Sequence, residues 1–444
     1  MRPPSYKAVV DEFAAAIRGG RLAPGTRLPT HRELAAQRRV ALGTATRVYA
    51  ELAAMGLVLG EPGRGTFVRD QAGFDGADPS RHLPVRRTAD LSFTQPLTED
   101  QPDQLRHALR ELAGSGDIGS LLRQQPPGGR HHERAAVATH LLDRGIDTAP
   151  DGVVLTNGTQ HALDTVLRVL TRPGDVVAAD ALTYPGLRLL ATAHHLELAP
   201  VAGGDTGPDL DALDRLCRAR RVRVLYTIPT LHNPLGWVLD RATRSRLAAL
   251  ADRHDLTIVE DGTYAFLDPS APPPLQTLAP QRTCYVSGLS KSLASGVRLG
   301  FAVVPARLVD ACAASLRAST WGLPALISAL VTGWIADGTV TRLEKHRRAD
   351  ARARQAVARA ALAGLDVAAH PASYFTWLRL EPHLRRDRVA AALAREGILV
   401  STADAFATDG NPPQALRLAL SEPPLGDLAA VLGRVRAVLE TFPL

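Results

Sequence analysis

VSGLSKSLASGVRLGF, residues 286–301, is the stretch on which the fold of the larger part of this chain depends. Its only lysine, Lys291, is one of three lysines among 444 residues, in a chain that otherwise uses arginine. A lysine amine condenses with an aldehyde to an imine and a guanidinium does not, so a lysine kept among these small residues indicates covalent chemistry. The alternative is an ordinary surface lysine on a loop.

Short apolar runs rich in β-branched residues alternate with helical Ala/Leu/Arg stretches from about residue 90 onward. The runs are Gly152–Thr156, Val176–Ala179, Val222–Ile228, Leu256–Glu260 and Thr283–Val286. Short buried strands separated by helices predict an α/β fold with a mostly parallel sheet covered on both faces. After about residue 330, a long Ala/Arg helix and the runs Tyr374–Leu380 and Leu416–Leu420 predict a small α+β subdomain.

The N-terminal 70 residues follow a different pattern. Val9, Phe13 and Ile17 recur at helical spacing, and Thr30-His31-Arg32-Glu33 is a capping box that opens a second helix. A third helix is expected at about 42–55, and the segment 57–68 reads as a β-hairpin around a Gly-rich turn. Three helices and a hairpin predict a winged helix-turn-helix.

These patterns divide the chain into four segments. We predict a winged-helix domain at 1–70, a linker at 71–88, a large α/β domain at 89–330 and a small C-terminal subdomain at 331–444. The linker assignment depends on few apolar residues and on several Gly, Asp and Pro.

Positive charge is concentrated in the first segment. Residues 1–70 hold eleven basic and six acidic side chains, which is five of the chain's seven net positive charges. Such a concentration is typical of a partner with a phosphate backbone, and a third helix of this kind enters the major groove of double-stranded DNA. The alternative is a solvated surface. The DNA-binding candidates are Thr44, Thr46 and Arg47 for bases, Arg27, His31 and Arg32 for phosphates, and Arg64 and Gly65 at the wing tip.

Residues 24–35, PGTRLPTHRELA, and 46–68, TRVYAELAAMGLVLGEPGRGTFV, resemble the GntR family of bacterial repressors. The resemblance implies a DNA-binding transcription regulator with an operator as its partner. Where many relatives have Ser-Arg at the start of the recognition helix, this chain has Ala41-Leu42.

A second set of residues meets the demands of pyridoxal 5'-phosphate. This cofactor needs a lysine, an acid beside its pyridine nitrogen and donors to its phenolate oxygen. Asp261 ends a buried run, where ligands bind in open α/β sheets, although an N-cap is the alternative. Tyr264 and Asn233 are the candidate phenolate donors; Asn233 alone would be read as a turn residue.

The same cofactor needs a phosphate cradle and a group that stacks on its ring. The candidates are Gly158, Thr159 and Gln160 at a strand-to-helix turn, Ser287 and Arg298 near the lysine, and Tyr184 as the stacking ring. Arg417 lies inside an apolar strand, where it fits an amino-acid carboxylate or else a structural salt bridge.

Taken in order, these residues resemble fold-type I aminotransferases of the aspartate aminotransferase class over residues 90–444, and the whole chain resembles the MocR regulators. That resemblance implies pyridoxal phosphate on Lys291, a head-to-tail homodimer, and a regulator that senses the cofactor, or an amino acid or amine as its aldimine. The alternative is a working aminotransferase that carries a DNA-binding head. Two positions depart from the family, Gln124 in place of a tyrosine and Gly288 in place of a Ser or Thr, and Ser287 is expected to compensate for Gly288.

Other classes of protein are disfavoured. The three cysteines lie far apart, and no stretch approaches 18 uninterrupted apolar residues, so we expect a cytoplasmic protein that does not enter membranes. The pairs His131-His132 and His194-His195 lack further ligands nearby, so we expect no metal site.

Overall fold

The computed structural model describes residues 6–18, 21–23, 25–54, 57–61, 65–68, 89–95, 98, 100–114, 118–409 and 412–441. Two units divide the chain, residues 1–87 and residues 88–444. The predicted linker and Arg64 lie outside the described residues.

The N-terminal unit contains three helices and a hairpin, as predicted. The elements are α1 (Tyr6–Arg18), α2 (His31–Arg38), α3 (Leu42–Ala54), β1 (Val58–Glu61) and β2 (Gly65–Val68). The capping box at α2 is formed, because Glu33 N donates to Thr30 Oγ1 at 3.3 Å and Thr30 N donates to Glu33 Oε2 at 2.7 Å. Leu34, Val48 and Leu52 are fully buried in its core.

The larger unit is built on a seven-stranded sheet with the order β4-β12-β11-β10-β9-β5-β6. Its strands are β4 (Val153–Thr156), β5 (Val176–Asp180), β6 (Glu197–Val201), β9 (Val222–Thr227), β10 (Thr257–Asp261), β11 (Thr283–Gly288) and β12 (Gly300–Val303). Neighbouring strands are parallel from β11 to β6, and β12 is antiparallel to both of its neighbours. The predicted mostly parallel sheet is therefore confirmed.

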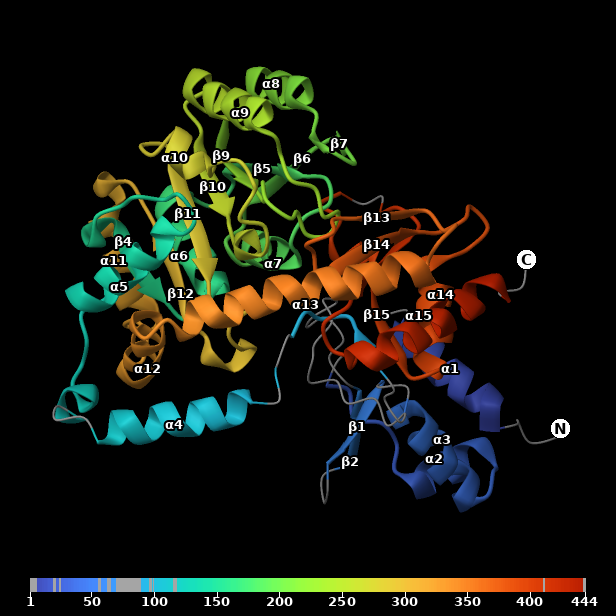
Figure 1. Ribbon diagram of the computed structural model, residues 1–444. Coiled ribbons are helices and arrows are strands. Elements are labelled where there is room, and N and C mark those ends of the chain that lie inside the picture. The colour runs from blue at the N-terminus through green and yellow to red at the C-terminus, as the bar shows by residue number, and fades with distance from the viewer. Residues whose placement is uncertain are drawn as a thin grey trace. The chain divides into compact units, whose positions relative to one another are not determined.

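Helices cover both faces of this sheet (Figure 1). They are α5 (His131–Leu142), α6 (Thr159–Leu170), α7 (Pro185–Ala193), α8 (Leu210–Ala219), α9 (Arg241–Arg253), α10 (Leu275–Leu278), α11 (Val309–Ser319) and α12 (Ala325–Ala336), with a short ribbon of β7 (Gly203–Gly204) and β8 (Gly207–Pro208). Along β5, Val177 and Ala179 join one buried cluster and Val176 and Ala178 join another, as alternation in a two-sided sheet requires.

A five-stranded sheet with the order β13-β14-β16-β15-β3 forms the small subdomain. Its elements are β13 (Val367–Ala369), β14 (Phe375–Arg379), α14 (Arg386–Arg395), β15 (Ile398–Thr402), β16 (Ala415–Ala419) and α15 (Leu425–Glu440). The long helix α13 (Thr339–Ala361) runs from the large sheet to this one (Figure 1). Strand β3 (Ala89–Leu91), which the sequence analysis placed with the large domain, pairs in parallel with β15 instead. Among the described residues, no helix is long and apolar enough to cross a membrane.

Candidate cofactor site and DNA-binding surface

The residues predicted to bind a cofactor lie at the carboxyl ends of five strands that run in the same direction. Gly158 follows β4, Tyr184 follows β5, Asn233 follows β9 and Asp261 ends β10. Lys291 comes three residues after β11. Ligands bind at this edge in open α/β sheets, because the loops that leave it face a common space.

Lys291 is half-buried, and its Nζ donates to the backbone oxygen of Thr94 at 2.7 Å. Burial, together with the nearby charges of Arg417 and Arg298, lowers the pKa of Lys291 from 10.5 to about 8. A larger share of the amine is therefore neutral near neutral pH than in an ordinary lysine, and the neutral amine is the form that attacks an aldehyde. This environment does not suit the alternative of a surface lysine on a loop.

Asp261 is buried at the end of β10, and each of its carboxylate oxygens accepts a hydrogen bond. Thr263 N donates to Oδ1 at 2.9 Å, and the hydroxyl of Tyr226 donates to Oδ2 at 2.8 Å. Burial raises the pKa of Asp261, while the hydrogen bonds from Thr263 and Tyr226 act in the opposite direction. Sequence reasoning missed Tyr226, because the run 222–228 gave only the signal of a buried strand.

Tyr264 and Asn233, the predicted phenolate donors, are both buried. The ring of Tyr264 meets Phe375 edge-on at 5.2 Å between centroids, and burial raises the pKa of its hydroxyl. Burial raises the pKa of Tyr184, and the nearby negative charge of Asp261 acts in the same direction; the hydroxyl of Tyr264 also lies close. The structure thus gathers the predicted stacking ring, the acid and one phenolate donor.

The turn between β4 and α6 contains a glycine where neighbouring groups approach the backbone closely. Gly158 has φ +83°, and a Cβ there would lie 2.7 Å from Nη2 of Arg298. Gly158 and the start of α6 lie directly against Gly300, where a Cβ would lie 2.2 Å from the carbonyl carbon of Gly158. The predicted phosphate residues Gly158, Thr159 and Arg298 are therefore neighbours.

The departure at Gly288 has a steric cause. A Cβ at position 288 would lie 2.7 Å from Thr159 Oγ1 and 2.9 Å from the backbone oxygen of Leu299. The hydroxyl of Thr159 thus occupies the space that a side chain at 288 would need. The hydroxyl of Ser287, which was expected to compensate, donates to the backbone oxygen of Gly262 at 3.2 Å.

Gln160 and Gln124 lie in different surroundings from each other. Gln160 Nε2 donates to Gly186 O at 2.9 Å, so the structure joins Gln160 to the loop that carries Tyr184. Gln124 has an exposed side chain.

Arg417 lies in β16, buried, with its Cζ 5.2 Å from the centroid of the Phe406 ring. Its Nη2 donates to the backbone oxygen of Ser92 and, at 3.4 Å, to Ser401 Oγ. Burial lowers the pKa of Arg417, while the nearby Asp90 carboxylate acts to raise it, so the structural role considered as an alternative stays open. The buried guanidinium retains a charge that a carboxylate can neutralise.

Several buried polar atoms of this region have no hydrogen-bond partner among the described residues. They are Gln160 Oε1, Thr183 Oγ1, Asn233 Oδ1, Ser290 Oγ and Arg417 Nε. A buried polar group left unpaired costs about 1–3 kcal/mol, so their concentration here indicates a polar ligand. Together with the three cations and the glycine-lined turn, this set of donors and acceptors fits pyridoxal phosphate.

The predicted DNA-binding residues lie on the surface of the N-terminal unit. Arg27, Arg32, Thr46 and Arg47 are exposed, and His31 and Thr44 are half-buried. His31 stacks on Tyr49 at 4.9 Å and lies 3.4 Å from Thr46 Oγ1, while the guanidinium of Arg47 lies 4.1 Å from the centroid of the Tyr6 ring. Arg27 also lies beside Gly65 of the wing, since a Cβ there would be 3.0 Å from its Nε.

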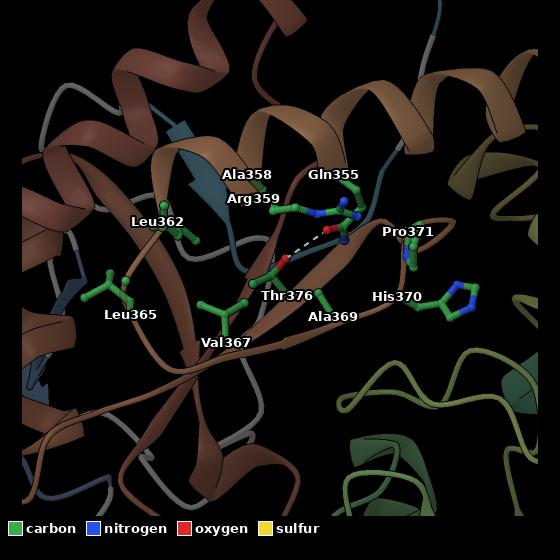
Figure 2. A pocket seen from close by; sticks show the side chains of 12 residues that line it. Gln355, Ala358, Arg359, Leu362, Leu365, Val367, Ala369, His370, Pro371 and Thr376 are labelled. Atoms are coloured by element: carbon green, nitrogen blue, oxygen red, sulfur yellow. Dashed lines mark hydrogen bonds between the residues drawn. The ribbon is translucent and has the colours of Figure 1, made fainter.

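Two other features lie apart from these residues. A cavity of about 250 Å³ opens between α13 and the strands β13 and β14, and none of the predicted site residues line it (Figure 2). Within the described part of the chain, no three His, Cys, Asp or Glu side chains are grouped as a metal site requires. His194 of the second histidine pair bonds Asp164 at 2.6 Å.

Comparison with known proteins gives two family matches. Residues 87–435 match aminotransferase class I and II, and residues 5–68 match the bacterial regulatory proteins of the gntR family. The chain is similar to YdeF, an HTH-type transcriptional regulator of Bacillus subtilis strain 168, with 27% identity over 95% of this chain and 91% of that one. It is also similar to the probable rhizopine catabolism regulatory protein MocR of Rhizobium meliloti, with 27% identity over 78% and 74% of the two chains.

A solved structure shares the fold of the larger unit. It is LysN, the alpha-aminoadipate aminotransferase of Thermus thermophilus, complexed with N-(5'-phosphopyridoxyl)-L-leucine. The TM-score is 0.72 and the identity 25%, over 79% of this chain and 92% of that one.

Proposed function

Because the chain belongs to the aminotransferase class I and II family and begins with a helix-turn-helix domain of the gntR family, we propose that it is a transcription regulator of MocR type. It binds an operator in double-stranded DNA through the N-terminal unit. It binds pyridoxal 5'-phosphate through Lys291, and it senses this cofactor or an amino acid or amine that reacts with it.

The observation that carries this proposal is the environment of Lys291. The amine donates to Thr94 O at 2.7 Å, and burial together with the nearby cations Arg417 and Arg298 lowers its pKa to about 8. A phosphate and a carboxylate would supply the negative charges that this group of cations lacks. The bound cofactor would supply an aldehyde that captures amines and a ring that withdraws electrons.

Each residue of the candidate cofactor site has a separate role in this proposal. Lys291 attacks the aldehyde, and Asp261 holds a proton at the pyridine nitrogen. Tyr264 and the amide of Asn233 donate to the phenolate oxygen, and Tyr184 stacks on the ring. The phosphate is held by Gly158, Thr159 and Arg298 at the start of α6, and Arg417 binds the carboxylate of an amino acid.

Contacts near residue 90 support a link between this site and the DNA-binding unit. Lys291 donates to Thr94 O, and Arg417 donates to Ser92 O. Residues 92–94 follow β3, which comes directly after the segment that connects the two units in sequence. A ligand that engages both cations competes with this backbone, and such differential contact is what a ligand needs to shift an equilibrium.

A working aminotransferase is the second candidate function. The observation that favours it is that Lys291, Asp261, Tyr264 and Arg417 provide the amine, the acid, a phenolate donor and a carboxylate site within one buried region. Those four groups are sufficient for the exchange of an amino group.

The resemblance to MocR regulators also implies a head-to-tail homodimer. An exposed helix supports this proposal: α4 (Gln101–Ala113) has no buried residue, and it exposes Leu105 and Leu109. A second subunit that covers this face would remove apolar surface from water. Analytical ultracentrifugation of the full chain tests it, and a monomer at micromolar concentration would contradict it.

One experiment separates the regulator from the enzyme. DNA ligands for the full chain are first selected from a random-sequence pool, and a selected duplex is labelled. Pyridoxal phosphate, and then a panel of amino acids and amines, is added while the absorbance of the cofactor and the Kd for the duplex are both measured. For a regulator, we expect the Kd to change at least tenfold, about 1.4 kcal/mol, together with the spectrum.

Two variants control this measurement. Lys291→Ala should lose both the borohydride-stable adduct and the response on DNA, whereas Lys345→Ala, which removes an exposed lysine on α13, should keep both. A spectral change with formation of a keto acid, but without a change in Kd, would favour the enzyme. A persistent adduct in Lys291→Ala would exclude Lys291 as the attachment site.

A further inference from the structure

Tyr226 is a buried residue for which the proposed function has no role so far. It lies near the carboxyl end of β9, and its side chain is fully buried. Its hydroxyl donates to Asp261 Oδ2 at 2.8 Å across two neighbouring parallel strands. The other oxygen of Asp261 accepts from the backbone N–H of Thr263, two residues along the chain, so Tyr226 is the donor that a separate strand brings to this carboxylate.

The surroundings of Tyr226 keep its hydroxyl protonated. Burial raises its pKa well above 10, and the negative charges of Asp261 and Asp180 and the hydroxyl of Tyr184 act in the same direction. A tyrosine that keeps its proton over the whole physiological pH range can act toward Asp261 only as a donor. Its position is fixed, because its ring packs in the apolar cluster beneath the sheet edge with Val224 and Val259.

A donor to a buried carboxylate changes where a shared proton resides. Burial raises the pKa of Asp261, which favours the neutral acid, whereas a hydrogen bond from Tyr226 stabilises the ionised form. An acid beside a pyridine nitrogen shares one proton with it. The more the carboxylate is stabilised as an anion, the more the proton resides on the ring.

We propose that Tyr226 is a positioning residue that keeps Asp261 ionised and directed at the pyridine nitrogen of pyridoxal phosphate. Tyr226 thereby sets how strongly the cofactor ring withdraws electrons. This inference rests on the proposed binding of the cofactor to Lys291. The competing interpretation is that Tyr226 only satisfies a buried carboxylate and has no effect on the cofactor.

The test is a spectroscopic pH titration of the full chain loaded with pyridoxal phosphate. Tyr226→Phe removes one oxygen and keeps the ring. A less protonated pyridine withdraws fewer electrons, so the nitrogen that links Lys291 to the cofactor retains its proton to higher pH. We expect the absorbance midpoint of this nitrogen to move upward by about one pH unit, as the loss of a hydrogen bond to a charged group predicts. An unchanged midpoint would overturn the proposal.

Tyr374→Phe is the matched control. The hydroxyl of Tyr374 also donates to a carboxylate, Asp350 Oδ2 at 2.8 Å, but Asp350 lies on α13 and belongs to no part of the proposed site. The same chemical change there should leave the midpoint where it is in the wild type. An equal shift in both variants would assign the effect to general loosening of the protein and would contradict the proposal.

Two further measurements complete the test. In the Asp261→Asn background, Tyr226→Phe should add no shift, because Tyr226 acts through Asp261; an additional shift of full size would contradict this. The ¹⁵N resonance of labelled cofactor in the wild-type chain should be that of a protonated pyridine, which needs no variant to fold. If the wild type binds no cofactor, the proposed function fails; if it binds and the ring nitrogen is neutral, only the role of Tyr226 fails.

Discussion

The pH dependence of cofactor capture by Lys291 follows directly from its environment. Its pKa is lowered from 10.5 to about 8, chiefly by burial and then by the positive charges of Arg417 and Arg298. Below both values, a shift of this size raises the neutral fraction of the amine about 300-fold over that of an ordinary lysine. Protonated amine does not attack an aldehyde, so the capture rate should rise about tenfold per pH unit below the pKa and level off above it.

The assay uses the full chain freed of cofactor and mixed with excess pyridoxal phosphate between pH 6 and pH 10. The rate is followed by absorbance, and the adduct is trapped with borohydride and located by peptide mass. We expect the rate to level off near pH 8 and the mass label to lie on Lys291. A rate that keeps rising to pH 10, or a label spread equally over Lys345, would refute the explanation by burial and positive charge.

One variant separates the two causes of this shift. Arg417→Met removes a buried positive charge while it keeps an apolar side chain of similar length, so the pKa of Lys291 should rise and the rate should level off at higher pH. Arg379→Met is the matched control, because Arg379 pairs with Asp205 and Asp366 on the surface. A rate profile that is the same in Arg417→Met as in the wild type would exclude Arg417 and leave burial and Arg298 as the causes.

Three other predictions concern packing and DNA binding. Gly288→Ser should lower the free energy of unfolding by about 1–3 kcal/mol in urea titrations, because its Cβ would meet the backbone at Leu299; Gly296→Ser, at an open position, should leave it unchanged. Thr30→Ala should destabilise the N-terminal unit by about 1 kcal/mol, measured by thermal unfolding, through loss of the capping box. Arg47→Ala should weaken binding to a selected duplex by about 1–3 kcal/mol if Arg47 contacts a base, and unchanged fluorescence anisotropy would remove it from the interface.

Local patterns were sufficient to predict the two architectures. Apolar runs rich in β-branched residues predicted β5, β9, β10 and β11. These strands are buried on both faces, so their apolar residues follow one another along the chain. Strand β12 was not predicted, since it has four residues, begins with a glycine and pairs in the opposite direction. The pairing of β3 with β15 joins segments more than 300 residues apart, and no local pattern contains that information.

In the candidate site, too, some residues have a local sequence signal and others do not. Lys291, Asp261 and Gly158 could be predicted, because each combines a residue type with a place at a strand end. Tyr226 could not, since its ring satisfies the pattern of a buried strand and only its hydroxyl, through a partner on β10, has a polar role. The departure at Gly288 was explained only when Thr159, distant in sequence, was found in the space of its missing side chain.

The backbone at residues 92–94 is where the proposed regulation would act. Ser92 O accepts from Arg417 and from Ser401 Oγ at 3.0 Å, and Thr94 O accepts from Lys291. Covalent attachment of Lys291 would remove the ammonium donor from Thr94, and a carboxylate on Arg417 would compete for the guanidinium held by Ser92. Two ligand groups would therefore weaken the contacts of the same short segment, which lies close in sequence to the connection to the helix-turn-helix. The coupling free energy cannot exceed what these hydrogen bonds contribute, about 1.5–3 kcal/mol for each charged donor. This range is sufficient for the tenfold change in DNA affinity expected of the regulator.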